Sequence, residues 1–140
     1  MVPVCPEQLG GLSTPRPPAT IFGGDGRDVL SGRARLRNDR DEDVTEAFLR
    51  GAREALGIAR ACGAAVALLK DQSPSCGCIT RYCDRPGGGM GVTAALLDAE
   101  GIRVLEIQPG GVFPPPGLEI DHGRLVPEAV HGAFIKKTGA

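Results

Sequence analysis

Two cysteines and two serines are concentrated in the segment KDQSPSCGC, which runs from Lys70 to Cys78. The segment follows the apolar run 66–69, which is typical of a buried strand that ends in a loop. Open α/β sheets place their binding residues where strands end. We therefore predict that Cys76 is a ligand-binding thiol, flanked by small residues that allow a close approach of the backbone.

The chain has five cysteines among 140 residues. Four of them fall in loops rich in Gly, Ser or Pro, namely Cys5, Cys76, Cys78 and Cys83. Cys62 follows a helical pattern, and we interpret it as structural. No apolar run is long enough to cross a bilayer and the N-terminus has no signal-peptide pattern, so we expect a cytoplasmic protein. In that reducing compartment, loop cysteines are more typical of metal ligands or reactive thiols than of disulfides.

The four loop cysteines leave three kinds of chemistry open. The spacing CxCxxxxC that begins at Cys76 differs from the paired CxxC motifs of zinc ribbons. An iron–sulfur cluster fits better, because soft thiolates from separate loops can hold corners of one cluster. A redox-active pair of Cys76 and Cys78 is the third alternative, although the usual redox motif is CxxC.

Helical and strand patterns alternate along the middle of the chain. Apolar residues recur at helical spacing over residues 43–62, and a glycine follows as a stop signal. An apolar strand is predicted over 64–69, a second helix over 91–100 and another strand over 102–107. This order predicts a single α/β domain with a parallel sheet and flanking helices.

The N-terminal third is less regular. Residues 2–4 resemble the tail of a strand, and the glycines and prolines of residues 10–26 predict a wrapped loop. Arginines alternate with apolar residues over 29–37, which predicts an edge strand or a hairpin arm. Its charged side is interpreted as a solvated face, with an anion-contacting strip as the alternative.

Composition narrows the range of partners. The formal net charge is −1 and only 4% of the residues are aromatic. The sequence therefore has neither the positive field nor the stacking platforms that are typical of nucleic-acid binders. We expect a small-molecule ligand.

Four motifs in one order resemble a known family: VCPEQLGGLSTPRPPATI, DVTEAFLRGA, AVALLKDQSPSCG and GVTAALLDAEGIRVLE. The family was first catalogued as a domain of unknown function, DUF523, and its better-understood members are thiouracil desulfidases. The resemblance implies a Rossmann-like α/β domain, here residues 1–108, with residues 109–140 as a C-terminal extension. It also implies a 4Fe-4S cluster that is held by three cysteines, so that one iron stays open to the sulfur of a thiolated pyrimidine.

Two of the three implied cluster ligands map onto Cys5 and Cys76. Family members begin further upstream, with a strand and a CLLG loop that supplies the remaining ligand. We therefore expect either that this segment is missing here or that Cys78 or Cys83 replaces its ligand, and we favour the first. A missing first strand would leave an exposed sheet edge, which predicts self-association as a homodimer.

The implied reaction is a non-redox hydrolysis that releases sulfide, in which the cluster acts as a Lewis acid. We predict Glu7 as the base that activates water, with capping of the following turn as the alternative. Ser73 and Lys70 are the further candidates for substrate contacts, and Ser73 could instead cap the turn after Lys70. Glu106 is a candidate acid. The alternative to an enzyme is a non-catalytic metal or iron–sulfur cluster-binding module.

Overall fold

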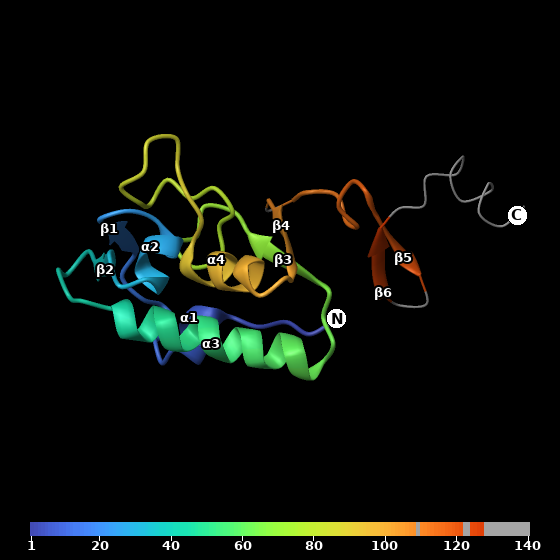
Figure 1. Cartoon of the computed structure of the whole chain (residues 1–140), viewed down its shortest axis with the longest axis horizontal. Coiled ribbons are helices and arrows are strands. Elements are labelled where there is room, and N and C mark those ends of the chain that lie inside the picture. Colours follow the sequence, from blue (N-terminus) through green and yellow to red (C-terminus); the bar gives the residue numbers. More distant parts are fainter. Residues whose placement is uncertain (109, 122–123, 128–140) are drawn as a thin grey trace, which may run out of the picture. The chain divides into compact units, whose positions relative to one another are not determined.

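The computed structural model describes residues 1–108, 110–121 and 124–127. Its elements follow one another along the chain in Figure 1 as α1 (Pro6–Leu9), β1 (Ala19–Phe22), α2 (Gly26–Leu30), β2 (Arg35–Asn38), α3 (Thr45–Ala61), β3 (Val66–Lys70), α4 (Val92–Ala99), β4 (Arg103–Ile107), β5 (Leu118–Asp121) and β6 (Arg124–Pro127). The described residues fall into two compact units, which divide after residue 109.

The first unit, residues 2–108 of the described chain, contains a parallel pair of strands. β3 pairs with β4 in the register Val66↔Arg103 to Lys70↔Ile107, and α4 connects the two strands. The long helix α3 packs against both α4 and α1 (Figure 1). Leu56, Leu69 and Leu97 belong to the apolar cluster between these helices and strands. The predicted α/β class is confirmed, and the parallel sheet of the described residues consists of these two strands.

One strand of a second, antiparallel pair lies inside the predicted wrapped loop. β1 pairs with β2 in the register Ala19↔Asn38 to Phe22↔Arg35. The expectation of irregular structure over 10–26 is therefore wrong for residues 19–22. The physical reason is burial: Ile21 and Leu36 are fully buried in an apolar cluster that also contains Phe48 of α3.

Two further predictions about the N-terminal third are corrected by the structure. The expected strand over 29–37 begins only at residue 35, because Asp25 caps a short helix, α2, with bonds to the backbone N–H groups of Arg27 and Asp28. Gly32 then takes a left-handed φ of 79° and turns the chain into β2. Residues 2–4 form no strand, and Pro3 lacks the N–H that a ladder requires.

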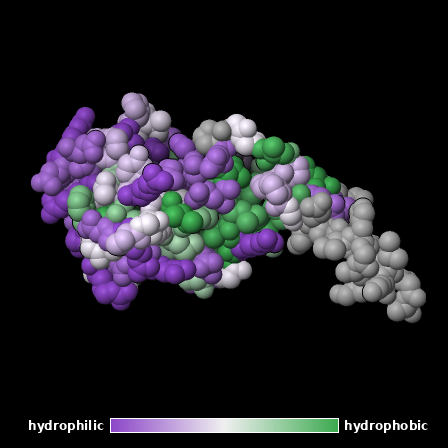
Figure 2. All heavy atoms as spheres, turned by 90° about the horizontal axis from the view of Figure 1, so that it is seen from above, coloured by the Kyte–Doolittle hydropathy of each residue, from purple (hydrophilic) through white to green (hydrophobic). Residues whose placement is uncertain are grey.

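The arginines of β2 and its approach are paired with carboxylates. Arg33 pairs with Asp28, Arg35 with Asp43, and Arg37 with Asp41. These arginine side chains are mostly exposed. Figure 2 shows hydrophilic residues over much of the visible face of the first unit. The solvated-face interpretation fits this pairing better than an anion-contacting strip. Hydrogen bonds from Thr45 and Arg35 hold the pKa of Asp43 well below its usual range, at the start of α3.

The described part of the second unit contains the antiparallel hairpin of β5 and β6. Residues 109, 122–123 and 128–140 of the predicted C-terminal extension lie outside the described residues. Within the described part of the chain, no helix combines the length and the apolar character that a membrane crossing requires.

Candidate active site

Cys5 is placed by a short helix that lies against α3. It is the N-cap residue of α1, and Pro6 occupies the first helical position, where a missing N–H costs nothing. Two glycines permit the close contact between the helices. A Cβ on Gly10 would lie 1.9 Å from the Ala47 carbonyl oxygen, and one on Gly51 would lie 1.8 Å from the Pro6 carbonyl oxygen. The contact of α1 with α3 therefore fixes the position of the CPE motif.

Cys76 is placed by a loop that is bonded to the beginning of α4. Ser73 Oγ accepts hydrogen bonds from the backbone N–H groups of Ser75 and Cys76, at 3.1 and 3.0 Å. Ser75 Oγ and Thr93 Oγ1 share a buried hydrogen bond of 2.8 Å. The Ser75 carbonyl oxygen also accepts hydrogen bonds from the Thr93 and Ala94 N–H groups, so the loop supplies an acceptor for N–H groups in the first turn of α4. Ser75 thus has a structural role, and Cys76 follows it in a fixed turn.

The two loops meet through a chain of polar contacts. Arg16 Nε donates to Glu7 Oε2 at 2.6 Å, and Arg16 Nη2 lies 3.5 Å from Cys5 Sγ. On the other side, Ser73 Oγ lies 3.5 Å from Glu7 Oε1. The charges of Glu7 and Cys5 both act on Cys76. We call these five residues, Cys5, Glu7, Arg16, Ser73 and Cys76, the thiol-pair site.

Burial controls the protonation of the second thiol. It raises the pKa of Cys76 to about 11, against the opposing hydrogen bonds of Ser75 and Ser73 and with support from the negative charges of Glu7 and Cys5. Cys76 is therefore a protonated thiol at neutral pH in the metal-free protein. A metal that binds there must displace this proton, which couples metal loading to pH.

Arg16 was not among the predicted site residues. Besides its contacts with Glu7 and Cys5, Arg16 Nη1 donates hydrogen bonds to the Ser13 carbonyl oxygen and to Thr14 Oγ1. Its side chain is only 22% exposed. Its pKa is raised: burial lowers it, but the hydrogen bonds and charges of Glu7 and Cys5 outweigh that effect. A sequence signal existed, because Arg16 is the one charged residue between Glu7 and Asp25.

Lys70 and Glu106, also predicted as site residues, make no hydrogen bond or ion pair with the thiol-pair site within the described residues. Lys70 ends β3 with an exposed side chain that makes no hydrogen bond or ion pair in the part of the chain that the structure describes. Glu106 Oε2 accepts the backbone N–H groups of Cys78 and Ile79, at 2.6 and 3.1 Å. Glu106 therefore holds the loop that follows Cys76.

Cys78 and Cys83 have neighbours of their own. Burial raises the pKa of Cys78, and the charges of Glu106 and Asp98 add to the effect. Cys83 packs against the apolar cluster of Ile21 and Phe48, and its Sγ donates to the Thr80 carbonyl oxygen. Among the described residues, no three His, Cys, Asp or Glu side chains are grouped so that they could hold a metal ion. The loops of Cys5 and Cys76 are thus joined through Glu7 and Ser73, whereas Cys78 and Cys83 have other neighbours.

Comparison with known proteins identifies the class to which this fold and site belong. The family model for 2-thiouracil desulfurase matches residues 1–108, and the chain belongs to that family. The uncharacterised protein YbbK of Bacillus subtilis (strain 168) is 48% identical over 108 residues, which cover 74% of this chain and 72% of YbbK. The solved structure of the [4Fe-4S]-dependent thiouracil desulfidase TudS is similar with a TM-score of 0.59 and 40% identity, over 73% of this chain. The chain spans 64% of that TudS chain, which is less than two thirds of its length.

Proposed function

We propose that this protein is an iron–sulfur-dependent desulfidase that removes sulfur from thiolated pyrimidines such as 2-thiouracil by hydrolysis. The observation that carries the proposal is the convergence of Cys5 and Cys76, from distant parts of the sequence, beside one carboxylate and one guanidinium. Membership of the 2-thiouracil desulfurase family and the similarity to TudS, a [4Fe-4S]-dependent enzyme, support it.

The donor set fits part of a 4Fe-4S cluster. Cys5 and Cys76 supply two half-buried soft thiol ligands, and Arg16 lies close enough to Cys5 to offset the negative charge of its thiolate. A third ligand is still required, and Cys78 and Cys83 remain candidates only if their loop rearranges, because each now has separate neighbours. When bound, the cluster would supply a Lewis-acidic iron that polarises the carbon–sulfur bond.

The protein's own residues handle water and protons. Glu7 Oε1 accepts a proton from water as the water oxygen bonds to the thiocarbonyl carbon. The carbon–sulfur bond breaks, the sulfur takes up the protons and leaves as hydrogen sulfide, and the ring keeps a carbonyl oxygen. Arg16 and Ser73 contact the two Glu7 oxygens and orient the carboxylate. Lys70 remains a predicted substrate contact, and its exposed side chain makes no hydrogen bond or ion pair within the described residues.

Several finer sequence-based expectations belong to the same proposal. The parallel β3–β4 pair with α4 between its strands supports a Rossmann-like arrangement. A cytoplasmic location is supported by the free state of all five cysteines. Homodimer formation remains a prediction, which light scattering after size exclusion would test.

Sulfide release from 2-thiouracil by anaerobically reconstituted protein tests the function. Wild-type protein is expected to form uracil and sulfide in equal amounts, and Glu7→Gln is expected to load iron but lose at least about 100-fold in rate. Cys78→Ser and Cys83→Ser identify whether either residue is the third ligand, by loss of iron. A stable cluster without sulfide release would favour the non-catalytic cluster-binding module, and the absence of any cluster would refute both functions.

A further inference from the structure

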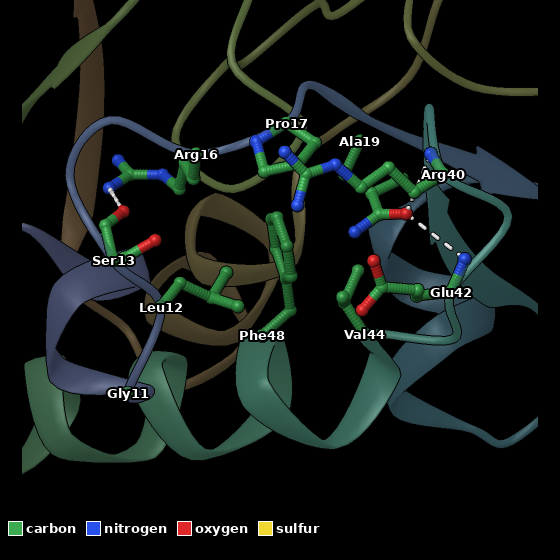
Figure 3. A pocket seen from close by; sticks show the side chains of 11 residues that line it. Gly11, Leu12, Ser13, Arg16, Pro17, Ala19, Arg40, Glu42, Val44 and Phe48 are labelled. Carbon is green, nitrogen blue, oxygen red and sulfur yellow. Dashed lines mark hydrogen bonds between the residues drawn. The ribbon is translucent and has the colours of Figure 1, made fainter.

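A pocket lies on the first unit where the chain passes from α1 to β1 and from β2 to α3. It has a volume of about 290 Å³, at the small end of the range for small-molecule sites. Figure 3 shows its base formed by Leu12, Val44 and Phe48, all of which belong to the first apolar cluster or pack against it. Phe48 is itself only 1% exposed, so the half-buried Leu12 and Val44 supply the apolar surface on which a flat ring can lie.

Polar groups above this base lack protein partners. Asn38 Oδ1 accepts the backbone N–H groups of Arg40 and Glu42, each at 3.0 Å, so its oxygen is occupied and its amide nitrogen is not. The side chains of Arg40 and Glu42 make no hydrogen bond or ion pair within the described residues. Figure 3 shows the Arg40 side chain extended across the pocket and the Glu42 carboxylate directed into it.

The unpaired state of Arg40 is unusual for this surface. Arg33, Arg35 and Arg37, which precede it in the same segment, all form ion pairs with nearby carboxylates. Arg40 and Glu42 have opposite charges and line one pocket, yet they are not paired with each other. Together with Asn38, they present two hydrogen-bond donors and one acceptor around an apolar base.

We propose that this pocket binds a pyrimidine base through the edge that carries a ring carbonyl next to a ring N–H. The carbonyl oxygen accepts from Arg40 and Asn38, the ring N–H donates to Glu42, and the ring face lies on the half-buried side chains of Leu12 and Val44. The charges of Arg40 and Glu42 offset each other, which suits an uncharged ligand. The choice of a pyrimidine among cyclic amides rests on the proposed function.

Arg16 places the pocket beside the thiol-pair site. Its side chain lines the pocket, while its guanidinium holds Glu7 and Cys5. The pocket uses no cysteine, so it binds uracil as well as 2-thiouracil and does so without a cluster. A base can thus be held next to the thiols before or after the chemical step.

Titration of cluster-free protein with uracil, followed by calorimetry or ligand-observed NMR, tests the site. Asn38→Asp keeps the oxygen that holds the turn but removes the donor, and Glu42→Gln keeps the shape but removes the charged acceptor. Each variant, and Arg40→Met, is expected to bind uracil at least about tenfold more weakly. Arg53→Met, which removes an exposed arginine of α3 that does not line the pocket, is the matched control and is expected to bind as the wild type does.

A second ligand separates ring recognition from non-specific binding. Uracil methylated at both ring nitrogens has no N–H to donate, and it is expected to lose the Glu42-dependent part of the affinity. Equal binding of uracil and its dimethyl derivative, or unchanged binding by all three variants, would overturn the proposal. So would the absence of uracil binding in protein that releases sulfide from 2-thiouracil, whereas uracil binding without sulfide release would count against the proposed function alone.

Discussion

Removal of the Arg16 guanidinium tests how the thiol-pair site is held together. Arg16→Gln eliminates the 2.6 Å contact with Glu7 Oε2 and the contact with Cys5 Sγ. The paired side chains are only 22% and 18% exposed, so the Glu7 charge would be left without its partner in a largely desolvated position. Hydrogen bonds to charged groups contribute about 1.5–3 kcal/mol, and we expect a loss of about 2 kcal/mol in the free energy of unfolding. For a domain of this size, that loss corresponds to a decrease of roughly 8 °C in Tm.

Urea and thermal unfolding of cluster-free protein measure this loss. The matched control is Arg60→Gln, which breaks an ion pair with Glu100 whose side chains are 61% and 40% exposed. An exposed pair of this kind is worth at most about 1 kcal/mol, and we expect a loss below about 0.5 kcal/mol. The double variant Glu7→Gln with Arg16→Gln should lose less than the sum of the two single losses, because both remove one interaction. Equal effects of Arg16→Gln and Arg60→Gln would refute the reasoning.

Three further predictions concern the loops around the two thiols. Ser73→Ala removes the acceptor of two backbone N–H groups and should lower the free energy of unfolding, measured by urea denaturation, by about 1–2 kcal/mol. Ser73→Thr keeps a hydroxyl acceptor and should retain most of the wild-type stability. Glu106→Ala should lower the free energy of unfolding by about 2 kcal/mol in the same assay. Glu106→Gln should lower it less, because an amide oxygen still accepts the Cys78 N–H. Equal losses in both variants would contradict the role of Glu106 in holding this loop. The pKa of Cys76 is raised to about 11, whereas the thiol of the unfolded chain ionises near the ordinary value of about 9. Cluster-free wild-type protein should therefore lose free energy of unfolding as the pH rises from about 9 to about 11, and Cys76→Ala should lack this decrease. Parallel pH curves for Cys76→Ala and wild type would exclude Cys76 as the cause.

Local patterns were sufficient for the central elements of the fold. The apolar spacing over 43–62 predicted α3 to within two residues at its start and one at its end, because the amphipathic face and the following glycine are both local signals. The strands β3 and β4 were predicted from the apolar runs that precede and follow α4 in the sequence, because strands that pack against helices need apolar residues. In contrast, β1 has only four residues between glycine- and proline-rich stretches, and its pairing with β2 spans a distance that no local window covers.

The site was predictable in part for a similar reason. The motifs around Cys5 and Cys76 identified both thiols, and Glu7 and Ser73 followed from their places within those motifs. Arg16 was missed because its partners, Glu7 and Cys5, are reached only when the loop after α1 folds back. Spacing alone also could not separate Cys76 from Cys78. They are two residues apart, yet Ser73 holds the backbone of Cys76, on which the charges of Glu7 and Cys5 act, while Glu106 holds the backbone of Cys78.

Iron and acid-labile sulfide analysis of anaerobically reconstituted protein tests the central claim most directly, namely that Cys5 and Cys76 hold one cluster. Wild-type protein is expected to contain about four irons and four sulfides per chain, as in the [4Fe-4S]-dependent relative. Cys5→Ala and Cys76→Ala should each lose the cluster, while Cys62→Ala, at the exposed end of α3, should retain it. Full iron loading in both Cys5→Ala and Cys76→Ala would contradict the account.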